Sequence, residues 1–216
     1  MKLKLIVTAA ALALIPTRTH AQSVVDFEDI QTERCWSFSP GRAVVSRGFS
    51  FSGIGDGLFS CLPGVIGGNT STALLNANGR SVLTMAAVDG AAFSLNAFFA
   101  GMRTGGPCSP ACTILEPYYA ADGITVVGNL VGGGSISQWV SLDTTAPFDF
   151  AEYLLPAGFT NLQSVVFTAT GTSTAPEFLI DDIAASSVVA TPEPSGASML
   201  LIGLSALLLK RRRRQR

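Results

Sequence analysis

Apolar and polar residues alternate along much of the chain, which is the pattern of strands that bury one face. Residues 92–100 show it best, because every second position is apolar, at Phe93, Leu95, Ala97 and Phe99. Comparable segments lie at 23–30, 43–52, 123–131, 135–142, 148–155, 162–170 and 177–185. Glycine-, proline- and asparagine-rich turn signals separate them. The pattern predicts an all-β, antiparallel β-sandwich with jelly-roll-like topology.

The first twenty-one residues follow a different pattern. Lys2 and Lys4 precede an apolar segment, residues 5–15, and Thr19-His20-Ala21 offers a small-residue cleavage site. This order is typical of a secretory signal peptide, so we expect residues 1–21 to be removed on export. The alternative is a buried N-terminal helix.

The C-terminal segment has three parts in a fixed order. Pro192-Glu193-Pro194 interrupts regular structure, an apolar run covers residues 197–209, and cations end the chain. The predicted single hydrophobic helix and its basic stop comprise Met199, Leu200, Leu201, Ile202, Leu204, Leu207, Leu208, Leu209, Lys210, Arg211, Arg212, Arg213 and Arg214. Such a helix reaches about 20 Å, short of a hydrocarbon core about 30 Å thick, so we expect a marginal membrane anchor. A cytosolic amphipathic helix is the alternative, but the run lacks a polar face.

This tripartite end resembles the PEP-CTERM sorting signal of Gram-negative bacteria. The resemblance rests on Pro192, Glu193, Pro194, the apolar helix and the arginine-rich end, although Thr191 stands where valine is commonest. It implies transient insertion in the inner membrane, processing by an exosortase, and delivery to the cell surface or an exopolysaccharide matrix. We therefore expect a sandwich ectodomain at 22–187 and a linker with the sorting signal at 188–216.

Charge is strongly segregated along the chain. All fifteen acidic residues lie between Asp26 and Glu193, an interval with five arginines and no lysine. The expected ectodomain thus carries about ten net negative charges, which argues against nucleic acid or anionic lipid as its partner.

Four cysteines, Cys35, Cys61, Cys108 and Cys112, are predicted to form disulfides, because the export signals place them in an oxidising compartment. Three connectivities are open, of which we favour Cys35–Cys61 and Cys108–Cys112. A metal site at the Cys-x3-Cys pair is the alternative, but no histidine or further nearby thiol completes it.

Acidic residues recur in the first and last expected strands, as Val-Asp-Phe-Glu-Asp-Ile from residue 25 and Phe-Leu-Ile-Asp-Asp-Ile from residue 178. This pairing resembles jelly-roll carbohydrate-binding modules. The resemblance implies a structural Ca²⁺ held by Glu28 and by Asp181 or Asp182. Neighbouring carboxylates also repel unless a cation or a proton intervenes. The alternative is that these acids face solvent.

Little supports catalysis. Once the signal peptide is removed with the only histidine, His20, the remaining chain has no lysine before Lys210, which excludes histidine- or lysine-based nucleophilic machinery. A two-carboxylate glycosidase stays open, with Glu116, Glu152 and Glu177, yet no spacing identifies a pair.

Aromatic residues suggest glycan stacking instead, with Trp139, Tyr118 and Tyr119 as candidates and core or rim packing as the alternative. The sequence predicts a non-catalytic exported surface or matrix protein, or alternatively a carbohydrate-binding module that adheres to exopolysaccharide.

Overall fold

The computed structural model describes residues 21–30, 35–37, 42–54, 57–61, 71–77, 82–102, 121–143, 150–173 and 175–187. All of them fall in one compact unit, His20–Val188. The rest of the expected signal peptide and the whole sorting signal lie outside the described residues. Within the described part, no helix is long and apolar enough to cross a bilayer.

The described residues form thirteen strands. They are β1 (Ala21–Val25), β2 (Cys35–Ser37), β3 (Val44–Ser46), β4 (Phe49–Ile54), β5 (Gly57–Cys61), β6 (Ala73–Ala77), β7 (Val82–Ala87), β8 (Phe93–Met102), β9 (Gly123–Leu130), β10 (Ser135–Ser141), β11 (Ala151–Leu154), β12 (Leu162–Thr170) and β13 (Phe178–Ser187). Every pairing between them is antiparallel. The predicted all-β, antiparallel class is confirmed.

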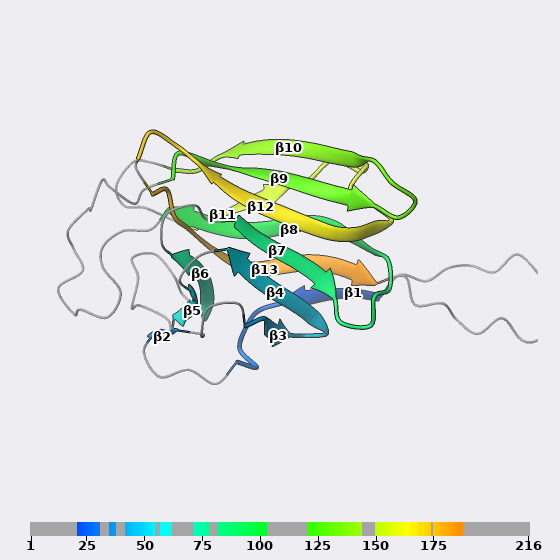
Figure 1. The fold of residues 1–216 in the computed structure, drawn as a ribbon, viewed down its shortest axis with the longest axis horizontal. Coiled ribbons are helices and arrows are strands. Elements are labelled where there is room, and N and C mark those ends of the chain that lie inside the picture. Colours follow the sequence, from blue (N-terminus) through cyan, green and yellow to red (C-terminus); the bar gives the residue numbers. More distant parts are fainter. Residues whose placement is uncertain are drawn as a thin grey trace, which may run out of the picture. The chain divides into compact units, whose positions relative to one another are not determined.

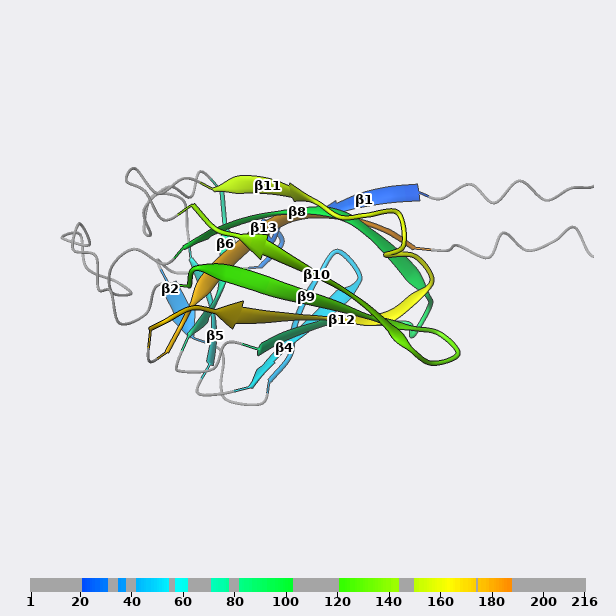
Figure 2. The same ribbon diagram turned by 90° about the horizontal axis from the view of Figure 1, so that it is seen from above.

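The strands form two layers, as Figure 2 shows. One layer has the order β10-β9-β12-β7-β4-β3. The other runs from β11 through β8 to β13, whose far edge pairs with β1 and with β6, and continues through β5 to β2. A single paired position, Leu162 opposite Phe93, joins the two ladders. The arrangement is β-sandwich-like, and jelly-roll connectivity stays a prediction.

Phenylalanines from facing strands fill the core between the layers. The Phe98 ring of β8 meets the Phe167 ring of β12 edge-on, with centroids 5.3 Å apart. Phe49 of β4 meets Phe93 of β8 at the same separation. Aromatic edges that approach ring faces gain electrostatic attraction beyond the area they bury, so these pairs fix the two layers against each other.

Sequence alternation misplaced part of β8. Phe98, rather than the predicted Phe99, faces the core, because β8 has an extra residue, Asn96, where its register with β13 shifts between Ala184 and Ala185, and this reverses which of the following β8 side chains point inward. The predicted strand at 23–30 ends at Val25, since Phe27 adopts a left-handed φ of 53°. The segment 43–52 is two strands, broken by Arg47 and Gly48 with φ values of 47° and 83°.

The first and last described strands lie side by side (Figure 1). Their antiparallel register places Ala21 opposite Ser187 and Val25 opposite Ile183. The two borders of the compact unit therefore leave the sandwich at the same end.

Candidate functional site

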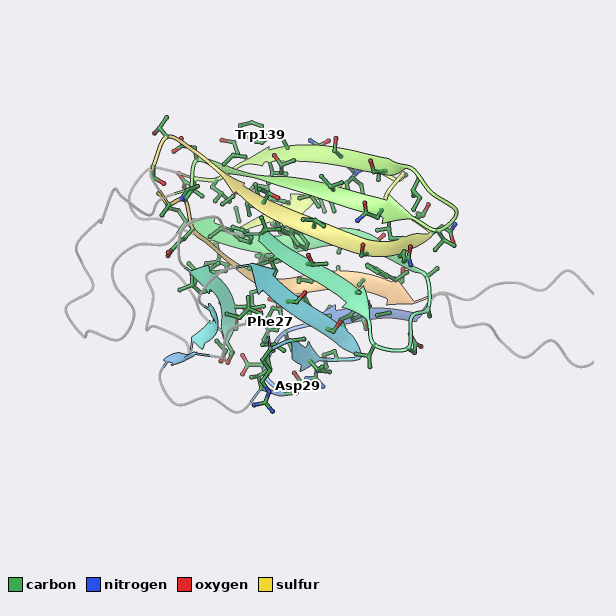
Figure 3. All side chains as sticks on the ribbon, in the orientation of Figure 1. Phe27, Asp29 and Trp139 are labelled. Atoms are coloured by element: carbon green, nitrogen blue, oxygen red, sulfur yellow. The ribbon has the colours of Figure 1, made fainter. Side chains whose placement is uncertain are left out.

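Trp139 is held on the outer surface of the sandwich by its neighbours. Its indole Nε1 donates a hydrogen bond to Thr170 Oγ1 at 3.1 Å. The ring lies against Gly123, because a Cβ added to that glycine would come within 2.7 Å of Nε1 and 2.9 Å of Cε2. The side chain is nevertheless 52% exposed. Its orientation is thus fixed from beneath while an apolar surface stays open to solvent (Figure 3).

Around Trp139, the outer face of β10, β9, β12, β7 and β4 consists of small polar and apolar side chains. Strand registers align them in rows across the sheet, and they alternate with the buried core residues of the same strands. We call this surface the neutral face; it comprises Ser135, Ser137, Trp139, Thr125, Val127, Asn129, Ser164, Val166, Thr168, Val82, Thr84, Ala86, Ser50 and Ser52.

The layer that carries the neutral face lacks charge. None of its strands, β10, β9, β12, β7, β4 and β3, contains Asp, Glu, Lys, Arg or His. A carboxylate stands at its rim, where Asp122 precedes Gly123 and accepts a hydrogen bond from the Thr172 backbone N–H at 3.2 Å. Recognition on this face must rely on hydroxyls, one amide, methyl groups and one indole.

The second predicted site, the carboxylates for calcium, does converge in space. Asp181 is only 2% exposed; one carboxylate oxygen is hydrogen-bonded to Ser71 Oγ and the other accepts from the Asp182 backbone N–H at 2.8 Å. Glu28 accepts from the backbone N–H and the Oγ1 of Thr72, at 2.7 and 3.1 Å. The segment after β1 and the segment before β6 are thereby joined to β13.

Burial and neighbouring carboxylates raise the pKa values of Asp181 and Asp182. Burial raises the pKa of Asp181 to about 7, and the nearby charges of Asp182 and Glu28 add to the effect. Burial likewise raises the pKa of Asp182, with contributions from Asp26 and Glu28. Within the described part of the chain, no group of three or more His, Cys, Asp and Glu residues could hold a metal ion. Calcium binding by Glu28, Asp181 and Asp182 therefore stays a prediction.

An ion pair fastens the same N-terminal segment to the β3–β4 turn. Arg47 Nε and Nη2 each donate to an oxygen of Asp26 at 3.0 Å, and this hydrogen bonding lowers the pKa of Asp26. Asp29 accepts from the Arg47 backbone N–H at 3.0 Å and is also hydrogen-bonded to Ser46. The two carboxylates thus hold residues 26–30 in place while Phe27, between them, enters the core beside Phe51.

The other predicted site residues are placed only in part. Tyr118, Tyr119, Cys108, Cys112, Glu116, Pro192, Glu193, Pro194 and residues 199–214 lie outside the described residues. The β2–β5 register sets Cys35 opposite Cys61, as the favoured disulfide requires of the backbone. Glu152 is exposed on β11 and Glu177 is fully buried before β13, so these two carboxylates do not share an open site.

Sequence reasoning identified Trp139 but neither Gly123 nor Thr170, which orient it. Gly123 is on β9 and Thr170 is on β12, and both are distant from Trp139 in sequence. The registers of β9 with β10 and with β12 bring the three residues together. A weak signal existed, since glycine inside a strand often marks a close approach of another group.

Comparison with known proteins gives only distant structural likenesses. No protein-family model matches the chain, and no curated protein matches it. Among solved structures, it is similar to the carbohydrate-binding module TmCBM61 in complex with β-1,4-galactotriose, with 8% identity over 74% of this chain and 92% of that chain and a TM-score of 0.31. It is also similar to the K2 cleaved adhesin domain of Lys-gingipain, with 16% identity over 76% and 97% and a TM-score of 0.33. Both likenesses are too distant to assign the chain to a family.

Proposed function

We propose that this chain is an exported, non-catalytic surface or matrix protein whose sandwich binds polysaccharide through the neutral face. The observation that carries the proposal is the fixed orientation of Trp139. An indole supported by Gly123, hydrogen-bonded to Thr170 and half open to solvent presents the flat apolar surface on which a sugar ring stacks.

Pre-organisation supports binding over simple packing. An aromatic side chain that must be immobilised on binding loses rotamer freedom, and the hydrogen bond from Trp139 to Thr170 lowers this cost because it restrains the ring in the free protein. Hydroxyls stand in the same row as the indole, at Thr125 on the neighbouring strand β9 and at Thr168 on β12, the strand beyond it. They supply donors and acceptors for the hydroxyl groups at the edge of a ring.

The proposed location rests on the two chain ends. The signal-peptide pattern at 1–21 supports export, and the Pro192-Glu193-Pro194 motif with its apolar helix and cations supports sorting by an exosortase. Such an address suits a protein that contacts an exopolysaccharide matrix.

Affinity gel electrophoresis tests the binding. The full chain, held in a polyoxyethylene detergent that carries no sugar, is run through gels with soluble dextran, galactan or hydroxyethyl cellulose. We expect at least one polymer to retard it, and Trp139→Ala to weaken that interaction about tenfold or more. Thr170→Val, which removes the acceptor for Nε1 but keeps the side-chain volume, is expected to cause a smaller loss.

Leu154→Ala is the matched control, because Leu154 is a 75% exposed apolar residue on β11 in the other layer. If Leu154→Ala weakened retardation as much as Trp139→Ala, the assigned surface would be wrong. Retardation by no polymer would refute the proposed function.

A further inference from the structure

The neutral face extends well beyond Trp139. One row crosses five strands, from Ser137 of β10 through Val127 of β9, Val166 of β12 and Thr84 of β7 to Ser52 of β4. At about 4.8 Å between neighbouring strands, this row is about 19 Å long. The parallel row beside it starts at Trp139 and continues through Thr125 and Thr168 to Val82. Such a surface is far wider than one sugar ring.

The chemistry along these rows is uniform. Hydroxyls at Ser137, Thr84 and Ser52 flank methyl groups at Val127 and Val166. All five side chains lie on the outer side: adjacent residues of β9, β12, β7 and β4, such as Val126 and Met85, are fully buried, and Ser137 of β10 is itself exposed. A sugar chain offers the same two chemistries in turn, namely hydroxyl groups at ring edges and C–H groups on ring faces.

The absence of charged side chains on the neutral face disfavours anionic polymers as partners. Its strands hold no cation to pair with a carboxylate or sulfate, and the rim carries Asp122. Arg47 on the β3–β4 turn is engaged by Asp26. A polyanion would find no cation on these strands to pair with its charges and would meet the Asp122 carboxylate at the rim, and like-charge contacts oppose binding.

We infer that the neutral face binds an uncharged polysaccharide as an extended chain, which crosses the strands from Trp139 on β10 to Ser52 on β4. This inference rests on the proposed function and adds the class of glycan and the length of the site. It requires that substitutions at the β4 end impair binding although they lie several strands away from Trp139.

The test uses pairs of polymers that share a backbone and differ in the charge of their substituents. Full-length protein in the same detergent is compared on hydroxyethyl cellulose against carboxymethyl cellulose and on dextran against dextran sulfate. We expect at least about tenfold weaker binding to the charged member of the pair that binds. We also expect Ser52→Glu and Thr84→Glu each to weaken neutral-polymer binding several-fold, with Leu154→Glu in the other layer as control.

The outcomes separate this inference from the proposed function. Equal or tighter binding of the charged polymer overturns the neutral class. Full binding by Ser52→Glu together with loss in Trp139→Ala confines the site to β10 and overturns the extended footprint, while polysaccharide binding itself stands. Absence of binding to all polymers overturns both. Ser52 is exposed, so Ser52→Glu keeps the test decisive even if Thr84→Glu fails to fold, which thermal unfolding of each variant reveals.

Discussion

Two residues in this chain are defined by what lies immediately against them. Trp139 is exposed yet supported on one side, because a glycine leaves room for its ring and a threonine accepts its only donor. Asp181 is the opposite case, a carboxyl buried among other carboxyls and satisfied by Ser71 and by the Asp182 backbone. Both depend on close contacts that a single-residue propensity does not describe.

The buried position of Asp181 predicts a pH effect on stability. The folded chain holds this proton up to a pKa of about 7, whereas the ordinary value is 3.8. Its contribution to stability is therefore complete below the ordinary value and is lost as the pH rises through about 7. Asp181→Asn keeps the hydrogen-bonding atoms without the charge, so we expect it to unfold at higher denaturant than wild type at pH 8, by a few kcal/mol, and to match it at pH 4.

Urea unfolding at several pH values, with and without a calcium chelator, checks this expectation. A wild-type midpoint at pH 8 that drops on chelation, with Asp181→Asn insensitive, would support the predicted Ca²⁺ at Glu28, Asp181 and Asp182 instead. Both proteins showing the same pH profile would contradict a raised pKa for Asp181.

At the scale of elements, alternation predicted β4, β9, β10 and β12, each of which buries one face, but it gave no strand at β7, where Leu83 and Met85 are buried and Thr84 between them is not. Phe49 and Phe51 of β4 are both in the core, and β9, β10 and β12 lie within one or two residues of their predicted bounds. It missed β6, in which Leu74 and Leu75 are both fully buried and no alternation exists to detect. It misplaced Phe99 because register shifts depend on the partner strand, which local sequence does not specify.

The candidate site was likewise predicted only in part from the sequence. Trp139 was one of three aromatic candidates for glycan stacking, and the structure leaves it 52% exposed, while glycan stacking on it stays a prediction. The neutral face could not be predicted, since it is assembled by registers among strands up to about ninety residues apart in sequence.

The β2–β5 pair carries a prediction about the cysteines. Directly opposed residues in an antiparallel pair have Cα atoms about 4.5–5.5 Å apart, within the range that a disulfide spans. We expect peptide mapping of non-reduced protein from the periplasm or medium to yield Cys35 linked to Cys61. The double variant Cys35→Ser/Cys61→Ser should lose about 2–4 kcal/mol of stability. A Cys35–Cys108 or Cys35–Cys112 linkage would contradict the prediction.

For the molecule as a whole, the candidate site and the chain borders lie at opposite ends of the sandwich. Ser187 and Leu162 both pair with Phe93, whereas Trp139 bonds to Thr170 at the other end of β12. Eight residue steps along that strand correspond to about 26 Å.

Intact-mass and terminal-peptide analysis of cell-associated and released protein tests the predicted processing. We expect the mature N-terminus to follow Ala21, and released protein to lack Leu204 and Arg212. Deletion of residues 192–216 should change where the protein accumulates. Released chains that still end at Arg216 would contradict exosortase sorting.

The antiparallel contact between β1 and β13 has a mechanical consequence. Force applied to Ala21 and Ser187 together acts at one end of their shared ladder, so it opens the hydrogen bonds in succession like a zip. Force between Ser187 and a glycan on Trp139 instead runs along the length of the sandwich and loads many hydrogen bonds at once. The sandwich should therefore unfold at low force when it is pulled at Ala21 and Ser187. It should resist a higher force when it is pulled between Ser187 and a glycan bound at Trp139.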